Sequence, residues 1–200
     1  KISNDNLNKL FWIHQGIRVT EEQKLQIDSY KPDYSDKYII AIGNENRNYE
    51  PLIESVKDLP INLYIFTTKR INSKYKNVFI KSTVDPDKSF KLMKYILNSL
   101  FIIIPLRLKS EVSHGITSAI EARYLKKIII SNKYCGLDYY IKDGFNGFLL
   151  ENKENYRNCI LKLLDDTYRK EIQQNIDNEN NGPNYMTWRG YCDIINSLNY

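Results

Sequence analysis

Cysteine is scarce in this sequence, and the few cysteines are too far apart to act together. Cys135, Cys159 and Cys192 are odd in number and widely spaced, so neither a disulfide framework nor a cysteine metal site is predicted. No other cluster of metal-ligating residues is visible. No apolar run reaches the roughly 18 residues that a membrane span needs, and the longest, residues 100–106, suits a buried strand. We therefore expect a protein of the reducing cytoplasm that binds no metal.

The N-terminus also lacks the marks of a chain start. It begins Lys1-Ile2-Ser3, without an initiator methionine and without the apolar core of a signal peptide. We therefore expect the chain to be a fragment of a longer protein.

A strong excess of charge is absent as well. The formal charge is +5, spread over Lys-rich polar faces. This surplus fits an anionic small ligand or weak peripheral attraction to the anionic inner face of a membrane, and a merely solvated lysine-rich surface remains an alternative. No basic-aromatic motif indicates nucleic acid.

What the sequence does contain is an alternation of short β-branched runs with amphipathic helical patterns. Strands are expected at residues 37–43, 61–66, 77–80, 101–106, 127–131 and 147–150, and helices at 49–57, 87–98, 118–125, 153–164 and 167–178. Strands that are apolar on both faces and alternate with helices predict an α/β, Rossmann-like parallel sheet with helices on both faces. Ligands of such sheets bind beyond the carboxyl ends of the strands.

This pattern divides the chain into three parts. Residues 1–36 are expected to be an N-terminal segment or an interdomain linker, and residues 37–178 to be the Rossmann-like domain. Residues 179–184 contain breakers, so a separate C-terminal helix is expected within residues 179–200.

The loop after the strand at 101–106 has the composition of an anion site. Gly115 beside a helix start lets backbone N–H groups approach an anion, and the helix dipole adds favourable charge. Glu121, expected in the first helical turn, suits two vicinal hydroxyls such as those of a ribose. A structural alternative is a capping box in which Ser118 is the N-cap and Glu121 reaches back to it. His114 has the alternative of an ordinary, half-exposed loop histidine.

Several segments together resemble one family. Residues 113–122 with Lys127 and 129–131 resemble the E-G-F-G-x4-E-A segment of retaining GT-B glycosyltransferases of group 1, residues 135–150 resemble its D-G-x-N-G block, and residues 41–53 resemble its opening strand, glycine turn and basic residue. The resemblance covers roughly residues 37–165 and implies that this chain is the C-terminal, donor-binding half of a GT-B enzyme.

The resemblance also implies the roles of individual residues. The donor-binding set is Gly43, Arg47, Lys69, Arg70, Ser113, His114, Gly115, Ile116, Thr117, Ser118 and Glu121. In this set Glu121 holds the ribose, the amides of residues 115–118 cradle the diphosphate, and Arg47 with Lys69 or Arg70 neutralises phosphate charge. For Arg47 and Arg70 a solvated surface position is the alternative. The first glutamate of the family pair is replaced by Ser113, so Glu111, two residues away, is a candidate substitute and, with Glu121, forms the catalytic assignment.

The function implied is transfer of a hexose from a nucleotide sugar, UDP-sugar first, to a glycan or lipid acceptor. The nucleotide sugar is a substrate, and no cofactor is expected. The acceptor site would lie in an N-terminal GT-B domain or partner chain that is missing here. Two alternatives remain: a noncatalytic nucleotide-sugar-binding or partner module with this half-fold, and a sugar-nucleotide epimerase. A phosphorylase would carry a cofactor-lysine motif, which is not seen.

Overall fold

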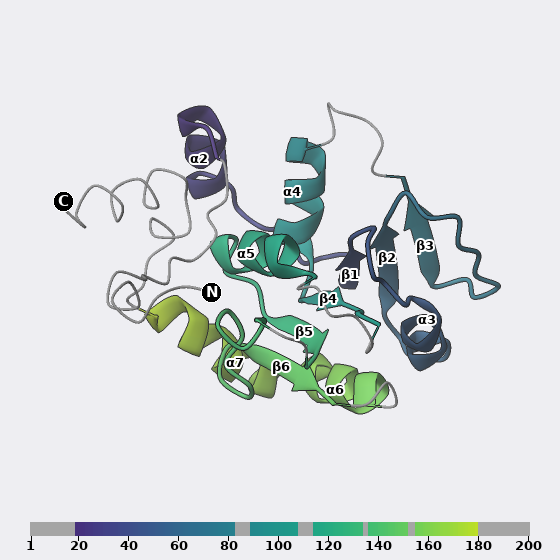
Figure 1. The fold of residues 1–200 in the computed structure, drawn as a ribbon. Coiled ribbons are helices and arrows are strands. Elements are labelled where there is room, and N and C mark those ends of the chain that lie inside the picture. The colour runs from purple at the N-terminus through teal and green to yellow at the C-terminus, as the bar shows by residue number, and fades with distance from the viewer. Residues whose placement is uncertain (1–18, 83–88, 108–113, 134–135, 152–154, 180–200) are drawn as a thin grey trace, which may run out of the picture.

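The computed structural model describes residues 19–82, 89–107, 114–133, 136–151 and 155–179, and they form a six-stranded parallel sheet in the order β3-β2-β1-β4-β5-β6 (Figure 1). The strands are β1 (Tyr38–Ile42), β2 (Asn62–Phe66), β3 (Val78–Lys81), β4 (Ile102–Ile104), β5 (Ile129–Asn132) and β6 (Gly147–Leu150). All neighbouring strands pair in parallel. The predicted Rossmann-like sheet is confirmed, and the order changes direction between β1 and β4, so that the site is expected there.

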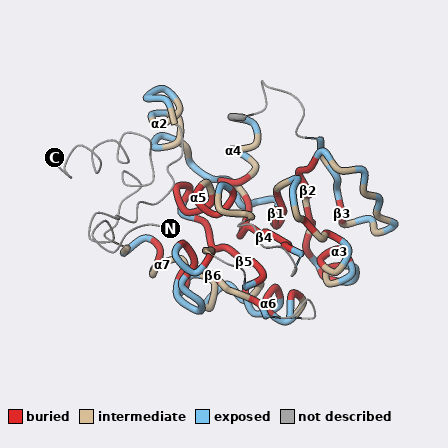
Figure 2. The backbone as a smooth tube through the Cα atoms, viewed as in Figure 1, coloured by how far each residue is buried: buried red, intermediate tan, exposed pale blue. Residues whose placement is uncertain are grey.

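Helices cover both faces of the sheet. They are α2 (Glu21–Asp28), α3 (Glu50–Val56), α4 (Ser89–Asn98), α5 (Ile116–Tyr124), α6 (Asn155–Leu164) and α7 (Asp166–Asn178). One buried cluster joins the sheet to α3, α6 and α7, and a second joins the opposite face to α4 and α5 (Figure 2). Because side chains alternate along a strand, Ile39 and Ala41 of β1 enter the first cluster while Ile40 and Ile42 enter the second. This double burial explains the unbroken apolar runs.

Helix α2 was not expected, because it lies within residues 1–36, where no helical periodicity was found. It begins with a capping box in which Thr20 and Gln23 exchange side-chain-to-backbone hydrogen bonds. None of its residues is buried, although Ile27 packs partly against the α4–α5 side of the core. A helix without an apolar stripe gives no periodic signal, so only the cap could have revealed it. The helix expected near the C-terminus lies outside the described residues.

None of the described helices is long and apolar enough to cross a membrane. The longest described helix, α7, has 13 residues and is amphipathic.

Strand β5 begins at Ile129 rather than at residue 127, because the side chain of Lys127 bonds to the end of α4. Its ammonium is buried and donates to the carbonyls of Leu97 and Ser99, at 2.6 and 2.9 Å, where α4 ends. A cation at a helix C-terminus offsets the exposed carbonyl dipoles. Burial nevertheless disfavours the charged form and lowers the pKa of Lys127 to about 7.

This buried lysine predicts a specific pH dependence of stability. Its pKa is about 7 in the folded chain against 10.5 when exposed, so between these values the unfolded chain binds more protons. Stability should therefore rise as the pH rises above 7. We expect the melting temperature of the wild type to increase between pH 6.5 and pH 8.5 relative to that of Lys127→Met, which is less stable throughout. Parallel pH curves for the two proteins, measured by calorimetry, would contradict this.

Candidate functional site

The first structural feature of the site is the tight turn after β1. Gly43 has a φ of +119°, and a Cβ at this position would lie 2.3 Å from a guanidinium nitrogen of Arg47. Only glycine combines this backbone conformation with such a close approach. The phenol of Tyr49 donates to the carbonyl of Gly43 at 2.5 Å and so stabilises the turn.

Arg47 is the buried centre of the site. It is 5% exposed, and its Nε and Nη1 donate to the carbonyls of Ile42 and Glu45 at 3.0 and 2.7 Å. Its Nη2 donates to Oγ of Ser118 at 3.1 Å, which ties the β1 turn to α5 across the switch in strand order. The alternative of a solvated surface arginine is therefore wrong.

Among the described residues, no carboxylate forms an ion pair with Arg47. All three acceptors of its guanidinium are neutral. Burial lowers the pKa of this guanidinium, yet arginine stays charged at any physiological pH. A buried cation whose hydrogen bonds go to neutral acceptors favours an anion nearby.

Helix α5 supplies an open N-terminus next to Arg47. It begins at Ile116, and its N-cap is Gly115 with a φ of +84° and no side-chain cap. The first amides of a helix have no intrahelical acceptor and point along the axis toward the positive end of the dipole. An anion beyond Gly115 would therefore meet backbone donors and a favourable field.

The capping-box alternative for Glu121 is wrong. Because α5 begins at Ile116, Ser118 is the third helical residue rather than the N-cap, and its hydroxyl accepts a hydrogen bond from Arg47. Glu121 lies in the second turn, not the first as the sequence indicated. The helix starts two residues early because a left-handed glycine, not a serine side chain, ends the preceding loop.

Glu121 presents an unused carboxylate. It is half-buried, and within the described residues it forms no hydrogen bond or ion pair. Burial alone raises the pKa of its carboxyl group. Residues three and four apart share a helix face, so Glu121 lies on the same side of α5 as Thr117 and Ser118. A partly desolvated carboxylate without donors suits a ligand that carries hydroxyl groups.

Neighbouring loops are joined to the β1 turn. Asn44 accepts from the hydroxyl of Thr67 at 3.1 Å and from the amide of Thr68 at 2.6 Å, which links the loops after β1 and β2. The amide of Arg107 donates to the carbonyl of Asn46 at 3.0 Å, which links the loop after β4. The sequence predicts no role for Asn44, Asn46, Thr67, Thr68 or Arg107. The polar residue directly after a strand-ending glycine was the available signal for Asn44.

Comparison with known proteins identifies the family. Residues 22–180 match the family described as "Glycosyl transferases group 1". This chain belongs to the group 1 glycosyl transferases. The chain is 24% identical over 153 residues to a protein described as an uncharacterised glycosyltransferase of Methanocaldococcus jannaschii, covering 72% of this chain and 42% of that relative.

Several solved structures share the fold of this chain. Sucrose-phosphate synthase from Thermosynechococcus elongatus has a TM-score of 0.60 at 14% identity, over 92% of this chain and 48% of that one. A glycosyltransferase from Rickettsia africae has a TM-score of 0.61 at 17% identity, over 96% and 57%. WaaG, a glycosyltransferase involved in lipopolysaccharide biosynthesis, has a TM-score of 0.56 at 15% identity, over 84% and 52%. The chain thus spans about half the length of these relatives.

The D-G-x-N-G block, residues 143–147, stabilises the turn that leads into β6. The side chain of Asp143 accepts from the amide of Leu149 at 2.9 Å, and Asn146 accepts from the amide of Lys142 at 2.8 Å. These bonds fold the turn back onto β6, the edge strand of the sheet. Asn146 also donates to Glu179, which forms a buried ion pair with Arg123.

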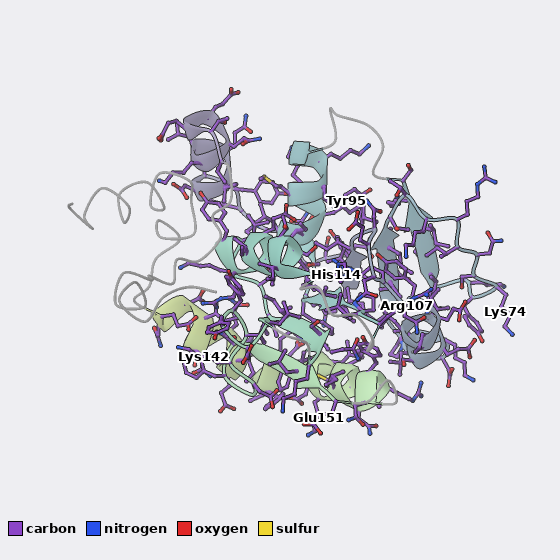
Figure 3. All side chains as sticks on the ribbon, viewed as in Figure 1. Lys74, Tyr95, Arg107, His114, Lys142 and Glu151 are labelled. Carbon is purple, nitrogen blue, oxygen red and sulfur yellow. The ribbon has the colours of Figure 1, made fainter. Side chains whose placement is uncertain are left out.

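The remaining predicted site residues that the structure describes lie around Arg47 and the start of α5, or on the loop after β2. His114 is half-buried at the start of α5, and Arg107 lies beyond β4 nearby (Figure 3). Lys69 and Arg70 follow β2, and in the described structure no contact joins them to Arg47 or to α5. The donor-binding role of Lys69 and Arg70 stays a prediction. Glu111 and Ser113 lie outside the described residues.

Proposed function

We propose that this chain is the donor-binding half of a glycosyltransferase and binds a nucleoside diphosphate sugar at the carboxyl edge of β1 and β4. The observation that carries the proposal is the buried Arg47 guanidinium, whose acceptors among the described residues are all neutral and which donates to Ser118 near the N-terminus of α5.

The diphosphate would lie between Arg47 and α5. The amides of Ile116 and Thr117 would donate to phosphate oxygens, and Gly115 offers no side chain to obstruct them. Sugar transfer releases a nucleoside diphosphate, so charge grows on the leaving oxygen as the glycosidic bond breaks. Fixed donors and a buried cation at that place stabilise the developing charge without reorganisation.

Glu121 would bind the ribose of the nucleotide. Its carboxylate lacks donors within the described residues, and vicinal hydroxyls provide two. Burial raises the pKa of the Glu121 carboxyl group above its ordinary range, and donation from two hydroxyls would lower it again by favouring the charged form. Ligand binding therefore resolves an unfavourable feature of the free protein.

The full reaction would need a second half. We take the donor to be a UDP-hexose transferred with retention to a glycan or lipid acceptor, on the cytoplasmic side of a membrane, with the acceptor bound by an N-terminal domain or partner chain. Relatives about twice as long as this chain support that division. Ser113, in place of the first family glutamate, would leave contact with the sugar to Glu111 or to other groups.

The test of the proposal is calorimetric titration of the chain with UDP, GDP and ADP. We expect saturable binding of one nucleotide, weakened by about 1–3 kcal/mol in Glu121→Ala through loss of charge-assisted hydrogen bonds. Glu171→Ala, an exposed glutamate on α7, is the matched control and should bind as the wild type does.

Each other outcome of the titration has a distinct meaning. Equal affinity in Glu121→Ala and wild type would remove Glu121 from the site while keeping the donor domain. No binding by folded wild-type chain would support the noncatalytic module suggested by Ser113. Conversion of a UDP-sugar without any acceptor would instead indicate an epimerase.

A further inference from the structure

The edge of the sheet at β3 lacks the cover that the other strands have. Parallel strands are normally joined by a helical crossover, but residues 67–77, all described, connect β2 to β3 without a helix. β3 is the outermost strand, and beyond the buried Val78 it leaves exposed apolar side chains on both faces. Phe79 and Ile80 point to opposite faces and are 39% and 37% exposed.

The charged residues of the segment that forms this edge are all basic, whereas Glu54 of α3 lies against the segment and accepts from the Tyr75 hydroxyl at 2.7 Å. Residues 67–82 contain no aspartate or glutamate, and their basic residues are Lys69, Arg70, Lys74, Lys76 and Lys81. None of these forms an ion pair with another described residue. Some basic side chains elsewhere are paired, as in Lys37–Asp166, Lys133–Glu151 and Arg157–Asp58. Unneutralised charge gathered on one edge of the sheet creates a local positive potential.

Aromatic rings lie among these cations. Tyr64 and Phe79 stack with centroids 5.0 Å apart, and the Lys81 ammonium is 5.2 Å from the centroid of Tyr64. The Lys74 ammonium is 5.3 Å from the ring of Tyr75. Figure 3 shows Lys74 at the outer edge, directed away from the body of the protein. We define the β3 edge surface as Lys74, Tyr75, Lys76, Phe79, Ile80 and Lys81.

We propose that the β3 edge surface docks against the anionic headgroups of a phospholipid bilayer. Lysines with long apolar stems, flanked by exposed aromatic and aliphatic side chains, match an interface that is charged outside and apolar beneath. A nucleic acid fits less well because base stacking needs open rings. Tyr64 already contacts three other rings as well as Lys81.

Docking through this edge would leave the candidate donor site accessible. Gly43 and Gly115 lie at the carboxyl ends of β1 and β4, whereas the β3 edge surface runs along the side of the sheet. The proposal therefore goes beyond donor binding and does not depend on it. Its test uses no nucleotide, so the two proposals fail separately.

The test is flotation of the full chain with vesicles of phosphatidylcholine alone and with vesicles containing phosphatidylglycerol. We expect binding to the anionic vesicles only, lost in high salt, and weakened roughly tenfold or more in Lys74→Glu/Lys76→Glu. The matched control is Lys162→Glu/Lys170→Glu, which reverses two exposed lysines on α6 and α7 that form no ion pair with described residues. Thermal unfolding of both variants checks that they fold.

Three results would overturn the proposal. Wild-type chain that stays with the soluble fraction shows that no lipid docking occurs. Equal weakening in the two double variants shows that net charge rather than the β3 edge surface governs binding. Binding to a soluble polyanion such as heparin, without binding to anionic vesicles, assigns the surface to a soluble acidic partner.

Discussion

Replacing Gly43 with alanine should lower the free energy of unfolding by about 3 kcal/mol and also weaken nucleotide binding. The φ of +119° is strained for any residue with a Cβ, and that Cβ would lie 2.3 Å from the Arg47 guanidinium. The guanidinium cannot move away freely, because three acceptors on the β1 turn and α5 hold it. Either the turn distorts or Arg47 leaves Ser118, so stability and the site suffer together.

Gly144→Ala is the matched control for this prediction. Gly144 also has a positive φ, +73°, but a Cβ there would meet no atom within 4 Å. This variant should lose only about 1 kcal/mol, from backbone strain alone, and should keep its nucleotide affinity. Chemical denaturation and calorimetric titration measure both quantities. Equal stability losses in the two variants would mean that the contact between Gly43 and Arg47 does not matter.

Replacing Arg47 with methionine should weaken nucleoside diphosphate binding by about 3 kcal/mol, roughly a hundredfold. The variant removes the buried positive charge beside the N-terminus of α5 and the bond that positions Ser118. The effect on stability should be smaller, about 1–2 kcal/mol, because lost hydrogen bonds are partly offset by relief of the buried charge. Affinity by calorimetry and stability by denaturation separate the two effects.

Two further variants complete the Arg47 experiment. Arg157→Met removes an arginine that bonds to Ser55 and Asp58, away from the site, and should leave affinity unchanged. Arg47→Lys keeps the charge but has a single donor group in place of three nitrogens, so an intermediate affinity is expected. If Arg47→Met binds nucleotide as well as wild type while losing stability, Arg47 is a structural brace and not a phosphate-binding group.

The role of Lys127 illustrates why sequence patterns misplace boundaries. The sequence places Lys127 at the start of a strand, because three isoleucines and a serine follow it at residues 128–131. In the structure its ammonium closes α4 through the carbonyls of Leu97 and Ser99, some 30 residues earlier in the chain. A long-range contact of this kind leaves no trace in local periodicity.

The sequence by itself determined the class of fold. Apolar runs that alternate with amphipathic helices allow little besides a parallel sheet covered on both faces, and Gly43 and Gly115 mark the turns at which we propose the site. Only the tertiary structure decided the state of the charges. Within the described part of the chain it buried Arg47 without an ion-paired carboxylate and left Glu121 without donors, and it made Ser118 a hydrogen-bond acceptor rather than a helix cap. Burial and pairing depend on residues far away in sequence, so no local pattern specifies them.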